Sequence, residues 1–356
     1  MFNKKLISVI VPVFNEEKFI EKCIKSILLF EKPKNIDFEI IIVDGNSNDK
    51  TVEILKKICK NHTNIFLINN PNKFQSFALN LGIRKSKGQY ILRLDAHAEY
   101  PTNYLKICYE TCILNSSDNT GGVLITKPGS KKFGGLLVQA LTTHKFGVGD
   151  SSFRTEEFSG EVDTVPFGFF NRNIFDEVGF FDERLIRCQD YEFNRRIIAS
   201  GNKIWMNSKI RAVYYNQPNL LSFLKKQFFL EAPYNPYLWY LAPYSFAFRH
   251  LITGIFSLGI LVGVSLLALD LPLKNLFIFV VILYIFLSIV SAFQQSLRYK
   301  KIPLLFTLPI CFFLFHFVHG LGVLKGIFYL ILKKSPVQSV KEPWPGAGRF
   351  YGLENY

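Results

Sequence analysis

An aspartate and a histidine lie one residue apart where an apolar run passes into a polar segment. Residues 91–102 read ILRLDAHAEYPT, which places Asp95 and His97 directly after the apolar residues. Side chains at positions i and i+2 beside a strand end point to the same side. A carboxylate and an imidazole can together bind one divalent cation such as Mn²⁺ or Mg²⁺. The pair therefore predicts a metal site, and the alternative is a solvated loop histidine.

The elements that position this pair are strands and helices in alternation. Residues 6–13 form a continuous, largely β-branched apolar run and are predicted to be a strand, as are residues 38–43, 64–69 and 90–94. The segments between them carry apolar residues at helical spacing, as at 74–85. Continuous apolar runs are typical of strands buried on both faces of a parallel sheet. This order predicts an α/β domain with a doubly wound, mostly parallel sheet and right-handed crossovers.

Candidate ligand-contacting residues stand at the ends of three of the predicted strands, at the edge where ligands of such sheets bind. They are Pro12, Phe14 and Glu16 after the first strand, Asp44 after the second, and Asp95 with His97 after the fourth. No glycine-rich dinucleotide motif and no Walker sequence follows any of these strands. Acids at this edge suit a ligand whose phosphates are neutralised by a metal ion and whose base or ribose is held by carboxylates.

The composition changes beyond about residue 220. Residues 251–269 and 276–293 contain no charged residue, and residues 302–324 contain none apart from two histidines. Each segment is long enough to cross a hydrocarbon core of roughly 30 Å. The third segment either crosses fully or turns back near residues 319–322 as a hairpin that ends at residue 332. We therefore expect a multi-pass membrane protein.

The basic residues favour a membrane surface over nucleic acid. The net charge is +14, and much of the positive charge borders the apolar segments without any nucleic-acid recognition motif. The loop at 270–275 is expected outside, and the loop with Arg298, Lys300 and Lys301 inside, which places the large N-terminal domain in the cytoplasm. If the third segment crosses, Lys333 lies outside, against this rule. The six scattered cysteines fit a reduced compartment.

These patterns divide the chain into four predicted parts. They are a cytoplasmic domain at 1–219, an interfacial amphipathic segment at 220–248, a transmembrane region at 249–334 and a C-terminal tail at 335–356. The interfacial segment combines Lys225 and Lys226 with many aromatic residues, a composition suited to the membrane interface.

Five motifs in order along the chain resemble those of the family 2 glycosyltransferases, which have the GT-A fold. They are SVIVPVFNEE at 8–17, IVDGNSNDKT at 42–51, ALNLGI at 78–83, RLDAH at 93–97 and QDYE at 189–192. The resemblance covers roughly residues 6–230. With the C-terminal membrane region, the chain looks most like the membrane-anchored bacterial succinoglycan-type exopolysaccharide transferases. It implies a UDP- or GDP-sugar donor that lies across the sheet edge.

The resemblance also implies roles for residues at this edge. By motif matching, Pro12, Phe14 and Glu16 contact the base, Asp44 contacts the uracil or ribose, and Asp95 with His97 takes the metal-binding Asp-x-Asp position within the donor site. A histidine in place of the second aspartate favours Mn²⁺ over Mg²⁺.

Asp190 matches the family's catalytic base. An acid in the first turn of a helix is kept ionised by the helix dipole, as a base must be. Glu192 is expected to be structural. The alternatives are that Asp190 is only a helix cap and that Asp44 is only a turn acid.

These expectations combine into one function. We expect an inverting, metal-dependent hexosyltransferase of the inner membrane that moves a sugar from a nucleotide donor to a lipid-linked glycan acceptor. The enzyme would act in the synthesis of bacterial exopolysaccharide or cell-surface glycans. The alternatives are a polyprenyl-phosphate sugar synthase and, from another class, a non-catalytic membrane scaffold of a polysaccharide assembly complex. Residues 227–231 read QFFLE where processive members have Gln-x-x-Arg-Trp, so single transfers are expected.

Overall fold

The chain forms two compact units. The computed structural model describes residues 5–149, 151–155 and 158–337. Within this part, the α/β unit comprises residues 5–125 and 158–214, and the helical unit comprises the remainder, 126–155 and 215–337. The predicted boundary at residue 219 assigned residues 126–155 to the first domain, whereas they pack with the C-terminal helices. Most of the predicted tail, from residue 338 on, lies outside the described residues.

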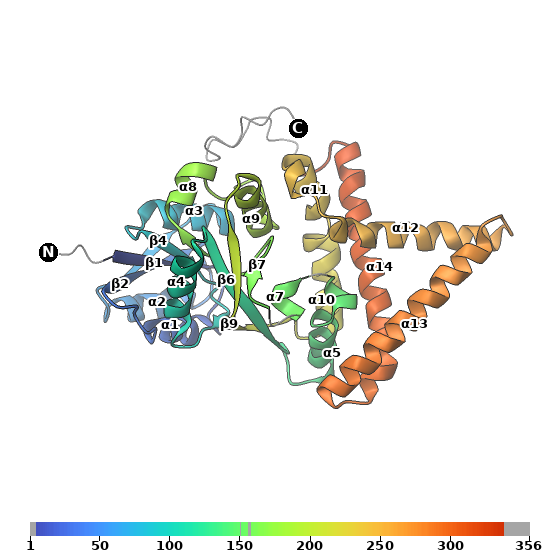
Figure 1. Cartoon of the computed structure of the whole chain (residues 1–356), viewed down its shortest axis with the longest axis horizontal. Helices are drawn as coiled ribbons and strands as arrows, with labels where there is room; N and C mark the ends of the chain where they lie inside the picture. The colour runs from blue at the N-terminus through green and yellow to red at the C-terminus, as the bar shows by residue number, and fades with distance from the viewer. Residues whose placement is uncertain (1–4, 150, 156–157, 338–356) are drawn as a thin grey trace. The chain divides into compact units, whose positions relative to one another are not determined.

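A mixed sheet is the core of the α/β unit (Figure 1). The strand order is β3-β2-β1-β4-β8-β6-β9-β5, and β7 pairs with β9. β1 pairs in parallel with β2 and β4, and β2 pairs in parallel with β3. The strands β8, β5 and β7 pair antiparallel with their neighbours. The bounds are β1 Lys5–Val13, β2 Ile36–Asp44, β3 Ile65–Asn69, β4 Tyr90–Arg93, β5 Ala98–Glu99, β6 Asn119–Lys127, β7 Gly160–Glu161, β8 Phe169–Asn171 and β9 Ile204–Tyr215.

The predicted alternation of strands and helices is confirmed in the parallel half of this sheet. The helix α1 buries Ile20, Cys23, Ile24 and Ile27, because these residues recur at helical spacing on one side. The helices of the α/β unit are α1 Ile20–Leu28, α2 Thr51–Cys59, α3 Gln75–Lys85, α4 Tyr104–Asn115, α8 Asn173–Val178 and α9 Gln189–Ala199. The predicted doubly wound sheet therefore forms, and antiparallel strands extend it.

The strand order explains where a ligand can bind. From β1 the chain proceeds through β2 to β3 on one side, and then returns to β4 on the other side. The connections therefore leave the carboxyl ends of β1 and β4 in opposite directions, and ligands of such sheets bind at this kind of position. The loop after β2 passes close to the segment before α3. A Cβ added to Gly45 would lie 2.7 Å from the carbonyl oxygen of Lys73, so only glycine fits after Asp44.

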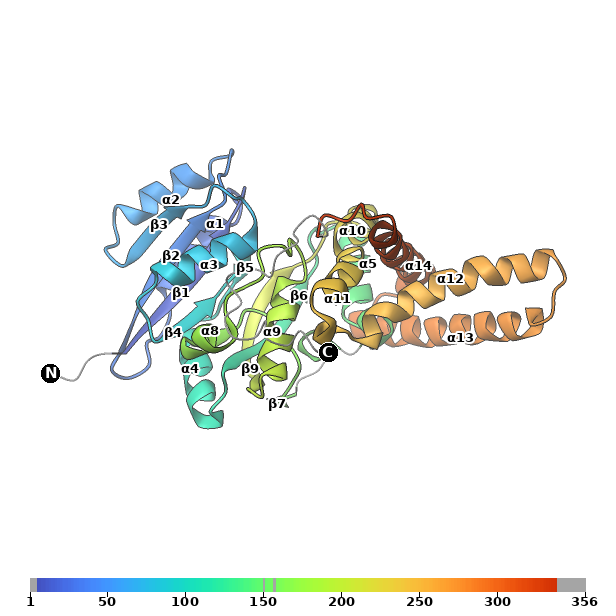
Figure 2. The ribbon, with the colours of Figure 1, turned by 90° about the horizontal axis from the view of Figure 1, so that it is seen from above.

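The helical unit contains long apolar helices and shorter ones packed against them. The long helices α12 Phe248–Ala268, α13 Lys274–Tyr299 and α14 Pro303–Ile331 can each cross a membrane by length and composition. Figure 2 shows the loop that joins the end of α12 to the start of α13. The remaining elements are α5 Phe133–Thr142, α6 Lys145–Val148, α7 Ser152–Thr155, α10 Leu220–Lys226, the π-helix Gln227–Glu231, α11 Tyr234–Leu241 and the 3₁₀ turn Pro243–Ser245.

Two features of the helical unit differ from the expectation or add to it. The helix α14 runs without a break through residues 319–322, so the structure has no hairpin there. The apolar helix α5 packs against α14, and its buried Val138, Ala140 and Leu141 join the core that Leu308 and Phe312 form. Because α5 has no membrane-length apolar run, its sequence did not indicate that it belongs with the C-terminal helices.

Candidate active site

A buried arginine joins the two carboxylates predicted to bind the metal and to act as the base. Arg93 is the last residue of β4, and its side chain is only 6% exposed. Its Nη2 atom lies 2.9 Å from Oδ1 of Asp95 and 3.1 Å from Oδ2 of Asp190. Its guanidinium carbon is 5.5 Å from the centre of the Phe167 ring. The end of β4 and the start of α9 are thus connected by one cation that rests on an aromatic ring.

Two glutamines form a second connection between the same elements. Gln75, at the start of α3, donates from Nε2 to Oδ1 of Asp95 at 3.1 Å. Gln189, at the start of α9, donates from Nε2 to Oε1 of Gln75 at 2.7 Å. Since Gln189 precedes Asp190 in the chain, the contacts close a ring. We call Gln75, Arg93, Asp95, Gln189 and Asp190 the Arg93 network.

The surroundings of Asp190 change its acidity. Burial raises the pKa of the Asp190 carboxyl, the Arg93 guanidinium opposes this change, and the Asp95 carboxylate adds to it, so that the pKa is raised overall. Among the described residues, its Oδ1 atom is shielded from solvent and has no hydrogen-bond partner. The side chain as a whole remains 36% exposed. Asp190 therefore combines a carboxylate oxygen that can accept a proton with a side chain that is partly open to solvent.

The predicted metal ligand His97 is paired with a carboxylate. Its Nδ1 atom lies 3.1 Å from Oε1 of Glu16, and its ring centre is 5.6 Å from that of Tyr214. When Glu16 accepts a hydrogen bond from Nδ1, the proton is fixed there, and Nε2 is the nitrogen with a lone pair for a metal. Glu16, which the family motif assigns to base recognition, contacts His97 in this structure, and its role in base recognition stays a prediction.

The loop after β2 uses the carboxylate of Asp44 for its own turn. Asp44 is buried and accepts hydrogen bonds from the amides of Asn46 and Ser47 at 3.1 and 3.0 Å, and from Ser47 Oγ at 2.6 Å. Asn15 connects the loop after β1 to the same turn, because its amide donates to Ser47 Oγ at 2.9 Å. The carboxylate is thus a turn acid, and its contact with uracil or ribose stays a prediction.

The remaining donor-site predictions differ in accessibility. Phe14 is 47% exposed and can offer a ring face to a base. Pro12 lies within β1 opposite Val43 and is buried. Of these two residues, only Phe14 presents its side chain at the surface.

A cysteine on α1 shows that the acids gather at one edge. The thiol of Cys23 lies 3.5 Å from the carbonyl oxygen of Asp95. Burial raises the pKa of this thiol, and the nearby carboxylates of Asp95, Glu16 and Glu99 raise it further. Asp95 and Glu16 are therefore close enough to act on the same group, as expected for loops that leave β4 and β1.

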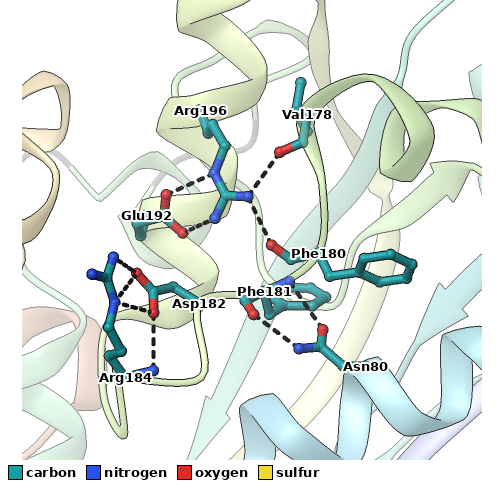
Figure 3. Close-up of polar contacts among 8 residues, drawn as sticks. All are labelled: Asn80, Val178, Phe180, Phe181, Asp182, Arg184, Glu192 and Arg196. Carbon is teal, nitrogen blue, oxygen red and sulfur yellow. Dashed lines mark hydrogen bonds and ion pairs between the residues drawn. The ribbon is translucent and has the colours of Figure 1, made fainter. Parts of the chain in front are cut away.

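Two buried ion pairs hold the segment that leads to Asp190 (Figure 3). Arg196 donates from Nε to Glu192 at 2.8 Å and from Nη1 to the carbonyl oxygens of Val178 and Phe180 at 2.8 and 2.7 Å. Asp182 forms a bidentate pair with Arg184. Glu192 is thus structural.

Asn80 supports the same segment from α3. Its side chain exchanges hydrogen bonds with the backbone N–H and C=O of Phe181 at 3.0 and 2.9 Å. The loop before α9 is therefore held from the α3 side as well (Figure 3).

Comparison with known proteins shows the family to which the chain belongs. The family profile described as Glycosyl transferase family 2 matches residues 8–179. A Methanococcus voltae protein is 30% identical over 338 residues, which are 90% of this chain and 97% of that protein. This chain is a family 2 glycosyltransferase. The relative is named dolichyl N-acetyl-alpha-D-glucosaminyl phosphate 3-beta-D-2,3-diacetamido-2,3-dideoxy-beta-D-glucuronosyltransferase.

Two further similarities cover less of the transferase. The succinoglycan biosynthesis protein ExoA of Rhizobium meliloti (strain 1021) is 27% identical over 215 residues, 60% of this chain and 64% of that protein. The crystal structure of S. aureus TarS 1-349 in complex with UDP-GlcNAc has a TM-score of 0.47 and 19% identity, and covers 62% of this chain and 64% of that one. Membership in an enzyme family favours catalysis over the scaffold alternative.

The Arg93 network is the part of the site that sequence reasoning missed. Arg93 stands two residues before Asp95, so strand geometry alone places both on one side. A charged residue in a strand predicted to be buried was the available signal. Gln189 stands in the QDYE motif, but its contact with Gln75 could not be predicted, because the two are 114 residues apart and meet only through the fold.

The predicted metal ligands fit a site that the substrate completes. Among residues 5–149, 151–155 and 158–337, no group of three or more His, Cys, Asp or Glu side chains could hold a metal. Asp95 and His97 offer one carboxylate and one imidazole. This donor set suits Mn²⁺ or Mg²⁺ when phosphate oxygens and water supply the other ligands.

Proposed function

We propose that the transferase moves one sugar from a nucleotide-sugar donor to a hydroxyl group of a lipid-linked glycan, with inversion at the anomeric carbon. The observation that carries this proposal is the contact of Asp190 with Arg93, which holds a carboxylate with raised pKa beside the donor-side Asp95. A hydroxyl acceptor must lose a proton as it attacks, so this acceptor class requires a base.

The acceptor class has support from two further observations. The Methanococcus voltae relative, which matches 90% of this chain, carries a dolichyl-linked amino sugar phosphate in its name. The helices α12, α13 and α14 would confine enzyme and acceptor to one membrane surface. The similarity to the succinoglycan protein supports a role in exopolysaccharide or other cell-surface glycan assembly. We place the α/β unit on the cytoplasmic side of the inner membrane, on the distribution of basic loops.

The reaction balances as a single displacement. The acceptor oxygen bonds to the anomeric carbon while the bond from that carbon to the donor phosphate breaks. The hydroxyl proton passes to Asp190, and the nucleoside diphosphate leaves with the bonding electrons. A divalent cation held by Asp95 and His97 would stabilise the negative charge on the diphosphate. Glu16 keeps His97 oriented, while Phe14 and Asp44 are proposed to contact the base and ribose.

Turnover by the full-length protein tests the proposal. Purified enzyme in detergent would be incubated with Mn²⁺, a panel of UDP- and GDP-sugars and a polyprenyl-phosphate-linked N-acetylglucosamine. Asp190→Asn should lower kcat/KM by about 10²- to 10⁴-fold, because it removes the base. The matched control is Asp176→Asn, an exposed aspartate on α8 that should leave turnover unchanged.

The same variant separates the two acceptor classes. Polyprenyl phosphate is already an anion and needs no base. If Asp190→Asn keeps its activity and polyprenyl phosphate is the acceptor that reacts, the enzyme is a polyprenyl-phosphate sugar synthase and the proposal is wrong.

A further inference from the structure

A single nitrogen atom of Arg93 contacts both carboxylates of the proposed reaction centre. Nη2 is 2.9 Å from Asp95 and 3.1 Å from Asp190. Asp95 lies in the loop after β4 and Asp190 lies in the first turn of α9. The separation of these two groups is therefore set through one atom.

Charge explains why a cation is needed at this point. Two carboxylates near each other in a poorly solvated site repel, and one of them takes up a proton unless a positive group lies between them. An arginine guanidinium is always protonated in proteins. The guanidinium thus offers one positive charge to both carboxylates.

The position of Arg93 is held from several directions. Its backbone N–H donates to the carbonyl oxygen of Gly168 at 3.0 Å, and the Phe167 ring lies against its guanidinium. The bond from Gln189 to Gln75 ties α9 to α3 and so limits movement of Asp190 relative to Asp95. This arrangement is more constrained than a surface ion pair, which is worth little.

The burial of Arg93 also limits what it can touch. Only 6% of its side chain is exposed. A guanidinium so covered is poorly placed to bind the donor phosphates itself. Its effect on the reaction must pass through the two carboxylates.

We propose that Arg93 is a positioning residue that sets the distance between the donor-side carboxylate Asp95 and the proposed base Asp190. The inference rests on the proposed function, since it takes Asp190 as the group that receives the acceptor proton. It adds that donor binding at Asp95 and acceptor activation by Asp190 both depend on the placement of Arg93. Gln75 and Gln189 reinforce this placement from the adjacent helices.

The test compares Arg93→Gln with Arg93→Lys in the full-length protein. Arg93→Gln should lower kcat about 100-fold through misplacement of the base, with kcat/KM for the donor falling equally. Arg93→Lys keeps a cation near both carboxylates and should have about a tenth of wild-type kcat, because its ammonium group does not hold the carboxylates in the same positions. The matched control, Arg211→Gln, removes an exposed arginine of β9 and should leave kcat unchanged.

Two readouts distinguish positioning from a general loss of structure. Calorimetry with UDP and Mn²⁺ should show that Arg93→Gln still binds the nucleotide. The acid limb of its pH profile should move to higher pH, because Arg93 no longer opposes the effects of burial and of Asp95 on the pKa of Asp190. A variant that loses nucleotide binding and activity together at every pH would show that Arg93 is merely structural.

Gln189→Met keeps the test decisive if Arg93→Gln does not fold. It removes the second connection while leaving the buried charges in place, and it should lower kcat about threefold to tenfold by slight misplacement. The inference is overturned if the wild type transfers sugar and neither Gln189→Met nor a folded Arg93 variant changes kcat. If the wild type transfers no sugar to any acceptor, the proposed function itself has failed.

Discussion

The α/β unit and the helical unit bury their polar side chains in different ways. In the α/β unit several of the buried polar groups carry full charges. Arg196 pairs with Glu192, Arg184 pairs with Asp182, and Arg93 contacts two carboxylates. Each of these cations lies against an oppositely charged partner and, for Arg196, also against backbone carbonyl groups.

In the helical unit the buried polar groups are hydroxyls, amides and imidazoles. The hydroxyl oxygen of Tyr284 lies 2.8 Å from Nδ1 of His316, and Oγ1 of Thr253 lies 2.8 Å from Nδ1 of His319. Gln295 donates to the carbonyl oxygen of Ala140. Figure 1 shows α12 and α13 diverging from their shared loop with α14 along the third side. A cavity of about 730 Å³ between these helices has an almost wholly apolar lining.

The difference follows from the surroundings that each unit is built for. A charged group is costly in hydrocarbon, so helices that cross a membrane satisfy their polar groups with hydrogen bonds that require no ion. An α/β unit in water can bury charges when each is paired and hydrogen-bonded. The proposed chemistry, which moves a proton and releases a diphosphate, is therefore expected to use charged groups of the α/β unit.

The largest expected effect is on the buried ion pair of α9. Arg196→Met should lower the free energy of unfolding of the α/β unit by about 3–5 kcal/mol, because it leaves Glu192 buried without its cation. Hydrogen exchange of α9 in the full-length protein would measure this change. The double variant Arg196→Met/Glu192→Leu should recover most of the loss. If it is as unstable as the single variant, packing and the carbonyl contacts of Arg196 matter more than charge.

The next effect concerns the metal ligands at the donor edge. His97→Ala should weaken Mn²⁺-dependent turnover about 10- to 100-fold, whereas His97→Asp should preserve activity and shift the preference toward Mg²⁺. Turnover titrated with each metal checks both outcomes. If His97→Ala changes neither the rate nor the metal preference, the ion rests on Asp95 alone, and the pairing of His97 with Glu16 has another purpose.

A further effect is the pH dependence that the charged site should impose. Since the pKa of Asp190 is raised, kcat/KM should fall on the acid side at a higher pH than for an ordinary aspartate, whose pKa is about 3.9. Between that value and the raised pKa, the folded state binds more protons than the unfolded one. Stability contributed by this group therefore falls as pH rises through the window. A limb at the ordinary aspartate value would contradict the assignment.

The smallest expected effect lies in the helical unit. Tyr284→Phe removes one hydrogen bond to His316 and should cost only about 0.6 kcal/mol, as for other polar contacts between membrane helices. A double-mutant cycle with His316→Phe in detergent would measure the coupling. A coupling of several kcal/mol would show that a neutral hydrogen bond of the helical unit is as strong as a buried ion pair of the α/β unit, and the contrast between the units would not hold.

The sequence by itself determined the elements of the parallel half of the sheet and the edge at which the candidate site is predicted. Strands at 6–13, 38–43, 64–69 and 90–94 follow from local apolar runs, and the parallel half of the sheet forms as predicted. The residues at the carboxyl ends of the strands follow from chain order alone. Sequence motifs are also local, so Asp95, His97 and Asp190 could be identified from them.

The tertiary structure decided which of these residues meet. Arg93 lies between Asp95 and Asp190, and Glu16 pairs with His97 from 81 residues away. Residues 126–155 likewise belong with the C-terminal helices because their apolar side chains pack against helices that are distant in the sequence. Local periodicity reports how a segment buries its own apolar face, but not which distant charge balances a buried carboxylate. That choice depends on three-dimensional proximity and on the cost of leaving a buried charge without a partner.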